Sequence, residues 1–141
     1  MHFCLMRLGS TIWFTPPTRK LALRVNGIGW KERMPECFIN RPSGTGDYLL
    51  MGFHGPAEFQ DATGKRRFDG SSYILWEPGD SHYYGCKDGP FVHSWLHAEG
   101  PTMAEIVRHA GLKSGVGHSV DDLSPLEQMS LLSGYKSNNS S

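Results

Sequence analysis

Short runs of aliphatic, β-branched and aromatic residues recur through the first hundred positions, and Gly, Pro, Asn and Asp separate them. The clearest run is 48–53, and 72–76 and 91–98 are two more. This spacing predicts short β-strands joined by tight turns, and hence an all-β barrel or sandwich. Weaker strand signals, with Asn26-Gly27 as a turn between the first two, lie at 21–25, 28–33, 37–39, 57–60 and 65–68.

After Gly100-Pro101 the apolar residues adopt the spacing of a helix. Thr102 is the expected N-cap, Glu105 completes a capping box, and Gly111 ends this helix. A second helix is expected to begin at Ser124-Pro125. The apolar stripes of the two helices comprise Met103, Ile106, Val107 and Ala110, and then Leu126, Met129 and Leu132.

These patterns divide the chain into four parts. We expect an N-terminal arm at 1–15, a barrel at 16–100, a helical extension at 101–133 and a disordered tail at 134–141. The arm contains apolar residues and ends at a double proline, so it must lie on another part of the protein. It forms either a first strand of the barrel or a segment folded over the mouth of a pocket.

Composition narrows the class of protein. A chain of 141 residues is one domain, and 14 basic residues against 14 acidic ones argue against a nucleic-acid-binding surface. Three cysteines without a Cys-x-x-Cys pair predict free thiols in a reducing cytoplasm. The first 14 residues do not resemble a signal peptide, and no segment is long enough to cross a membrane. We therefore expect a cytoplasmic protein without a membrane partner.

Candidate chemistry gathers on the strand at 91–97. Alternation places Phe91, His93, Trp95 and His97 on one face of this strand. Imidazole and indole groups suit a pocket for a sugar, whose C–H faces stack on aromatic rings and whose hydroxyls need fixed polar partners. The alternative is a core histidine beside a core tryptophan, and this strand alone does not separate the two interpretations.

The stretch Glu77-Pro78-Gly79-Asp80-Ser81-His82-Tyr83-Tyr84-Gly85 is a second candidate region. Its Pro-Gly-Asp turn delivers His82, Tyr83 and Tyr84 onto the next strand. A Pro-Gly-Asp-x-His turn resembles the second sequence motif of the cupin β-barrels. Metal-binding cupins carry a His-x-His pair and a Glu on an earlier strand, where this chain has His54 and Glu58 alone. An alternative metal set is therefore His54, Glu58 and His82 with His93 or His97, in a small cupin enzyme of the isomerase or dioxygenase type.

Four segments in order resemble the N-terminal effector-binding and dimerisation domain of AraC-type transcription regulators. The segments are Phe38-Ile39-Asn40-Arg41-Pro42, Tyr48-Leu49-Leu50, the stretch 77–85, and His93-Ser94-Trp95. This resemblance implies a mostly β fold: a cupin-like double-stranded β-helix, or jelly-roll barrel, with one or two C-terminal helices. It also implies a non-enzymatic domain that senses a small-molecule effector, a monosaccharide or related sugar, without a cofactor.

The resemblance also implies ligand-binding residues. Arg41 matches an arginine that hydrogen-bonds sugar oxygens, Tyr84 matches an aromatic lining the pocket, and His93 and Trp95 match a pair whose indole stacks on the sugar. We add His82, which the Pro-Gly-Asp turn delivers beside Tyr84. The chain would be a free-standing binding module or part of a longer regulator that dimerises and contacts DNA through a C-terminal domain absent from this chain. Residues 103–115 lack a usable recognition helix.

Overall fold

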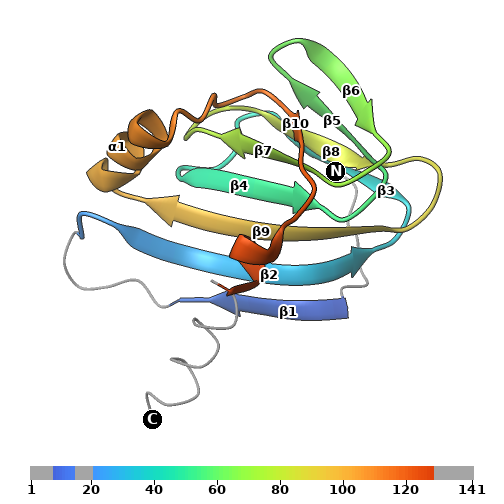
Figure 1. The fold of residues 1–141 in the computed structure, drawn as a ribbon, viewed down its shortest axis with the longest axis horizontal. Helices are drawn as coiled ribbons and strands as arrows, with labels where there is room; N and C mark the ends of the chain where they lie inside the picture. Colours follow the sequence, from blue (N-terminus) through green and yellow to red (C-terminus); the bar gives the residue numbers. More distant parts are fainter. Residues whose placement is uncertain (1–7, 15–20, 129–141) are drawn as a thin grey trace.

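The computed structural model describes residues 8–14 and 21–128, which form two antiparallel sheets (Figure 1). The six-stranded sheet contains, in spatial order, β1 (Leu8–Trp13), β2 (Arg24–Met34), β9 (Phe91–Glu99), β4 (Tyr48–Phe53), β7 (Ser72–Trp76) and β10 (His118–Ser119). The four-stranded sheet contains β3 (Cys37–Arg41), β8 (His82–Cys86), β5 (Ala57–Asp61) and β6 (Gly64–Phe68).

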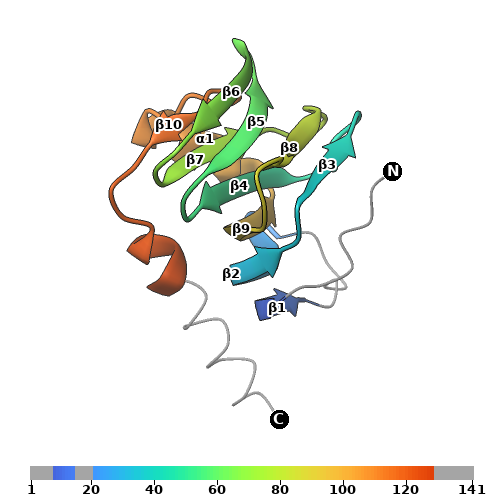
Figure 2. The same cartoon turned by 90° about the vertical axis from the view of Figure 1, so that its right-hand side faces the viewer.

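The strand order is that of a jelly roll. Eight strands run β2-β9-β4-β7 in one sheet and β3-β8-β5-β6 in the other, so the chain crosses between the sheets repeatedly (Figure 2). Two facing four-stranded layers wound in this way are the double-sheet jelly roll found in cupins. The predicted fold class, mostly β with a cupin-like barrel and C-terminal helices, is confirmed by this topology.

Apolar side chains pack in two layers. The first fills the space between the sheets and includes Met51, Phe53, Phe59, Ile74 and Trp76. The second lies on the opposite face of the six-stranded sheet, where Ile28 and Leu96 meet Leu123 and Leu126 of the C-terminal segment. Residues 124–128 are helical, in agreement with the expected second helix, whereas Met129 and Leu132 fall outside the described residues.

The predicted turn at Asn26-Gly27 is wrong, because β2 runs without interruption from Arg24 to Met34. Its glycines provide space instead of a turn. A Cβ on Gly27 would lie 2.5 Å from a ring carbon of Trp13, and one on Gly29 would lie 2.4 Å from the indole nitrogen of Trp95. The two tryptophans therefore rest directly on the backbone of β2.

Helix α1 (Pro101–Ala110) follows β9 and lies at one end of the barrel (Figure 1). Its N-cap is Gly100 and not Thr102, because the helix already begins at Pro101, whose fixed φ suits the first helical turn. Gly111 ends the helix in a left-handed conformation, as expected. Met103, Ile106 and Val107 face an apolar cavity of about 230 Å³ against the outer face of the six-stranded sheet.

The described part of the N-terminal arm is a strand. β1 pairs with β2 in antiparallel register, so the interpretation of the arm as a first strand holds for Leu8–Trp13, while residues 1–7 lie outside the described part. The expected disordered tail at 134–141 also lies outside it. Cys86 is a buried free thiol, but Cys37 is disulfide-bonded, which corrects the expectation of free thiols throughout. Within the described ranges, no helix has the length and apolar character needed to span a membrane.

Hydrogen bonds to Asp61 connect the loop after α1 with the hairpin of β5 and β6. Its buried carboxylate accepts hydrogen bonds from the backbone N–H groups of Thr63 and Gly117, the Thr63 hydroxyl, and the Arg66 guanidinium. Burial raises the pKa of this carboxyl, but these four hydrogen bonds outweigh it and lower the pKa to about 2. The Asp61 carboxyl is therefore ionised in the folded protein near pH 7.

We expect Gly29→Ala to destabilise the protein by about 1–3 kcal/mol, because the added methyl group has to displace the Trp95 ring. Gly46→Ala is the matched control, since a Cβ there meets no heavy atom within 4 Å. Urea unfolding of both variants measures the effect. Equal midpoints for Gly29→Ala and Gly46→Ala would show that Trp95 does not rest on the β2 backbone.

Replacing Asp61 by Asn should lower stability near pH 7 by roughly 2–3 kcal/mol, because the fall of its pKa from 3.8 to about 2 corresponds to about 2.5 kcal/mol at about 1.4 kcal/mol per pKa unit. The folded-state pKa of Asp61 lies below its ordinary value of 3.8, so this stabilisation is present above pH 3.8 and is lost as the pH falls toward 2. Urea unfolding at neutral and acidic pH measures it. A wild-type advantage that stays constant on acidification contradicts the assignment.

Candidate ligand-binding site inside the barrel

A β-bulge on β2 turns Glu32 toward the barrel interior. Gly29 lies opposite Trp95 and Glu32 lies opposite His93, so three steps along β2 correspond to two steps along β9. Without the extra residue, strand alternation would direct Glu32 outward. With it, the carboxylate is 1% exposed and lies beside His93.

The bulge is held by contacts on the outer face of the sheet. Lys31 has a φ of 50°, an unfavourable value for a residue other than glycine. Its N–H donates to Oγ of Ser94 at 2.9 Å, and this hydroxyl also lies 2.6 Å from Nε2 of His54. Burial, with the nearby Lys31 and His93, lowers the pKa of His54 to about 4, so His54 is neutral near pH 7. A strained bulge next to a buried carboxylate is typical of functional sites.

Glu32 and His93 form a buried pair between the sheets. Nε2 of His93 lies 3.1 Å from Oε2 of Glu32, and His93 is 3% exposed. Removing two polar groups from water costs free energy that such a pair recovers only in part, so it is weak evidence of a stabilising role. The arrangement instead fixes a carboxylate and an imidazole as hydrogen-bonding groups in the interior.

Tyr84 and Arg41 stand next to this pair on the opposite sheet. The rings of Tyr84 and His93 have centroids 5.8 Å apart, and Nη1 of Arg41 lies 3.4 Å from the Tyr84 hydroxyl. Tyr84 is buried, whereas Arg41 is only half-buried. Arg41 therefore connects the interior to the surface and has further N–H groups available to a ligand.

Trp95 lies on the other side of the Glu32 and His93 pair and is covered by the arm. Its ring centroid is 5.0 Å from that of Trp13, which is itself 5.4 Å from the ring of His97. Nδ1 of His97 lies 2.8 Å from the Asp47 carboxylate. Burial raises the pKa of Asp47, but hydrogen bonds, that from His97 first, lower it to about 2. Trp13 is 59% exposed and thus forms an outer cover over Trp95.

His82 is the most deeply enclosed of the predicted site residues. It is 0% exposed, and its ring stacks on Trp76 with centroids 4.7 Å apart. Neither ring nitrogen has a hydrogen-bond partner among the described residues. Burial, with the charge of Arg41, lowers its pKa to about 4, so the ring is neutral near pH 7. A buried imidazole of this kind has capacity for a water molecule or a ligand atom.

The structure brings the predicted ligand-binding residues into one interior region. Tyr84 contacts both Arg41 and His93. Trp95 lies opposite Gly29, beside Glu32. The ring of Trp76 contacts both His82 and Tyr84 and so connects them. Their burial also places Tyr84 and Trp95 in the hydrophobic core. The binding role of these five residues stays a prediction.

The alternative metal set is not brought together. His54 lies with Ser94 and Trp30 on the outer face of the six-stranded sheet, and the Glu58 carboxylate lies 3.8 Å from Nζ of Lys87, outside the interior. His82 and His93 remain inside. Within the part of the chain that the structure describes, no three His, Cys, Asp or Glu side chains form a metal-binding group.

Sequence reasoning missed Glu32, Asp47 and Trp13. The bulge hid Glu32, because it reverses the alternation that sequence patterns rely on. Asp47 falls in a loop that looked featureless, and Trp13 belongs to an arm without a readable register. The one available signal was Gly29-Trp30-Lys31-Glu32, where a glycine and charged residues interrupt an apolar run.

Comparison with known proteins adds little to what the strand order says about the fold. No protein-family model matches the sequence, and no curated protein matches it. The YhaK protein from Escherichia coli is similar over 66% of this chain and 45% of its own, with 18% identity and a TM-score of 0.49. A cupin domain from Bordetella pertussis is similar over 67% of this chain and 95% of its own, with 10% identity and a TM-score of 0.37. The chain thus spans less than half of YhaK, and the assignment to the cupin-like jelly rolls comes from its topology.

We expect Ser94→Ala to destabilise the protein by about 1–3 kcal/mol, because the Lys31 N–H and His54 both lose their partner at the bulge. Ser43→Ala, in an exposed loop position, is the control. Urea unfolding compares the two variants. If Ser94→Ala unfolds at the same urea concentration as Ser43→Ala, the hydroxyl does not hold the bulge.

Proposed function

We propose that this chain is the effector-binding domain of an AraC-family transcription regulator and that the barrel interior binds a sugar. The observation that supports this most is the combination of Trp95, Tyr84, Arg41 and the Glu32 and His93 pair in one interior region. An aromatic plate beside groups that both donate and accept hydrogen bonds matches a sugar, which presents apolar C–H faces and hydroxyls together.

The charges in this region favour a neutral ligand. Arg41 supplies N–H donors and Glu32 supplies a carboxylate acceptor, and a sugar hydroxyl can satisfy either of them. A phosphate or a sugar acid facing Glu32 would meet a like charge in a buried setting. The preferred effector is therefore an uncharged monosaccharide.

Trp13 offers a route from binding to regulation. It lies on Trp95 and belongs to β1, the outermost strand of the six-stranded sheet. A ligand that stacks on Trp95 moves Trp13 outward and then lies between the two rings, so the position of β1 depends on occupancy. A ligand that prefers one arm position shifts the population toward it.

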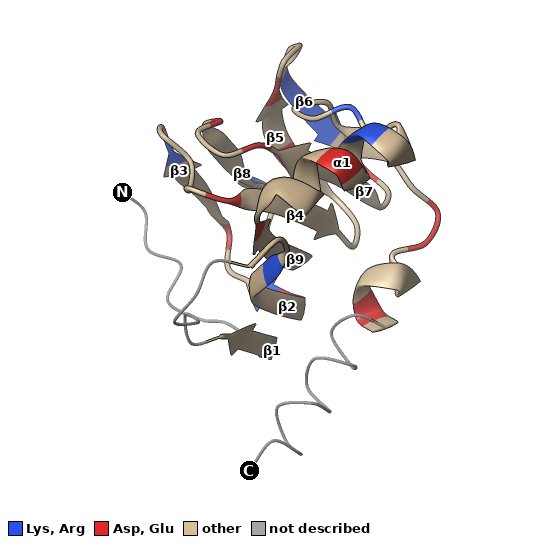
Figure 3. Ribbon diagram, turned by 90° about the vertical axis from the view of Figure 1, so that its left-hand side faces the viewer, with Lys and Arg blue, Asp and Glu red and all other residues tan. Residues whose placement is uncertain are grey.

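In this proposal the described part of the chain senses the effector and does not itself contact DNA. In the view of Figure 3, Lys and Arg are interspersed with Asp and Glu over the described elements. Binding to DNA would accordingly occur through a C-terminal domain outside this chain, and the arm would act on a homodimer of the regulator.

We expect a thermal-shift panel of neutral monosaccharides to contain at least one that raises the melting temperature, because a ligand selective for the folded state stabilises it by mass action. Calorimetric titration then gives its Kd. Arg41→Ala should weaken binding by about 10- to 100-fold, the value of a charge-assisted hydrogen bond. Trp13→Ala should also weaken it while sparing the core, since Trp13 is largely exposed.

Arg108→Ala is the matched control, because it removes an exposed arginine from α1. The proposal is contradicted if no monosaccharide stabilises the protein. It is also contradicted if a stabilising sugar binds the Arg41→Ala and Trp13→Ala proteins with unchanged Kd. Stabilisation by a divalent metal without any sugar response would instead favour the metal-dependent cupin enzyme.

A further inference from the structure

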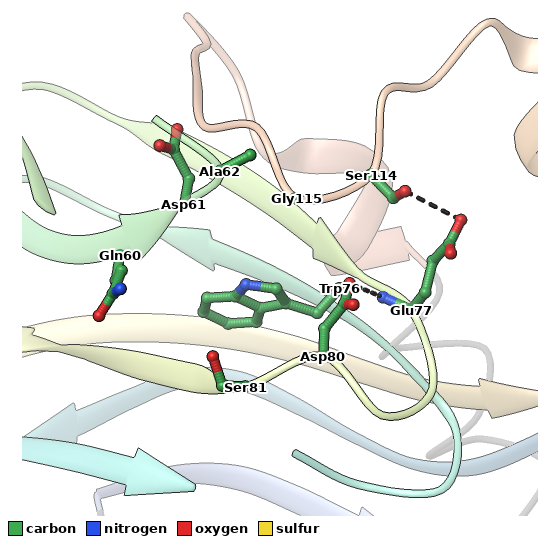
Figure 4. A pocket seen from close by; sticks show the side chains of 9 residues that line it. All are labelled: Gln60, Asp61, Ala62, Trp76, Glu77, Asp80, Ser81, Ser114 and Gly115. Atoms are coloured by element: carbon green, nitrogen blue, oxygen red, sulfur yellow. Dashed lines mark hydrogen bonds between the residues drawn. The ribbon is translucent and has the colours of Figure 1, made fainter. Parts of the chain in front are cut away.

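A second cavity lies outside the barrel interior, at the end of the strands where the Pro-Gly-Asp turn is found (Figure 4). Its volume is about 310 Å³, enough for a monosaccharide-sized molecule. Three segments form its walls: the end of β5, the turn between β7 and β8, and the loop after α1. The lining residues are Gln60, Asp61, Ala62, Trp76, Glu77, Asp80, Ser81, Ser114 and Gly115.

Hydrogen bonds fix these walls relative to one another. The Gly115 N–H donates to the Leu75 carbonyl at 2.7 Å, and the Gly115 carbonyl accepts from the Ala62 N–H at 2.7 Å. The Ser114 hydroxyl donates to Oε1 of Glu77, and the Glu77 N–H donates to Oδ2 of Asp80, both at 2.9 Å (Figure 4). The cavity is therefore preformed, which lowers the entropic cost of binding.

Trp76 presents an unused donor to this cavity. Its side chain lies between Gln60 and Ser81, and the indole nitrogen is on the ring edge turned toward Ala62 and Gly115 (Figure 4). The residue is 2% exposed, and none of the described residues accepts a hydrogen bond from its N–H. An indole N–H on a side chain as buried as this one normally donates to an acceptor, and from the cavity that acceptor can be an atom of a ligand.

The carboxylates in the walls set the charge that the ligand must carry. Asp61 is already satisfied by its four hydrogen bonds, one of which comes from Arg66. Glu77 and Asp80 each use one oxygen within the walls, which leaves Oε2 of Glu77 and Oδ1 of Asp80 for other donors. Among the lining residues that the structure describes there is no Lys or Arg. The cavity thus favours a cationic donor.

We propose that this cavity binds a small hydroxylated amine, such as an amino sugar. Its ammonium group pairs with Glu77 and Asp80, and a hydroxyl oxygen accepts the Trp76 N–H, with Gln60 and Ser81 as further polar contacts. The site is separate from the interior residues Arg41 and Trp95 and does not depend on their proposed role.

Titration with glucosamine and, separately, with glucose tests the proposal, since the two differ only at C2, where glucosamine has an amino group and glucose a hydroxyl. Near neutral pH, glucosamine should bind at least about tenfold more tightly than glucose, because a charge-assisted hydrogen bond is lost with the amine. In ¹⁵N NMR spectra the indole N–H signal of Trp76, assigned with Trp76→Phe, should move on addition of glucosamine.

Removal of both charges provides the matched variant. Glu77→Gln with Asp80→Asn keeps the side-chain oxygens that accept from Ser114 and Glu77, so the turn should stay folded. This double variant should weaken glucosamine binding at least about tenfold, as should high salt, while Glu105→Gln on the exposed face of α1 should leave binding unchanged.

Three results would overturn the proposal: no glucosamine binding, equal affinity for glucose, or binding that the double variant retains. If glucosamine binding is instead lost in Arg41→Ala and kept in the double variant, the amine occupies the barrel interior. Failure of the interior sugar site leaves the glucosamine titration of Trp76 unaffected, so the two proposals fail separately.

Discussion

The close contact between the backbone of β2 and the aromatic side chains of β9 is the constraint on which the interior depends. Gly29 lets the indole of Trp95 lie against β2. The bulge at Lys31 then shifts the pairing of β2 with β9 by one residue. This shift brings Glu32 to His93, whereas unbroken pairing from Gly29 onward would have placed Lys31 there. The polar centre of the barrel is thus a product of strand geometry as much as of side-chain choice.

The interior combines features that lower stability with features that position polar groups. A strained lysine, a carboxylate paired with an imidazole and a histidine without a described partner all occur within one barrel. The strained backbone of the exposed Lys31 carries a free-energy cost, and so does each polar group buried in a core that could have been apolar. The surrounding aromatic and aliphatic layers offset that cost. Such local conflicts with stability are expected where binding is the requirement.

The sequence predicted the elements better than the site. Strands were recognisable because period-2 alternation and turn residues are local signals, and their spacing predicted an all-β barrel or sandwich. The jelly roll itself was implied by the resemblance to AraC-type effector-binding domains. The dipeptide Asn26-Gly27 was misleading, since Gly27 is needed for contact with Trp13 and not for a turn. The second cavity could not be foreseen, because backbone hydrogen bonds join Gly115 to residues about forty and fifty positions away.

Trp76 separates the two proposed sites. One face of its ring stacks on His82, which belongs to the barrel interior, and its N–H edge faces the second cavity. A ring held between two compartments cannot shift toward one without changing the other. If a ligand in one site displaces this ring, it changes the free energy of binding in the other, and thermodynamic linkage then makes the effect equal in both directions.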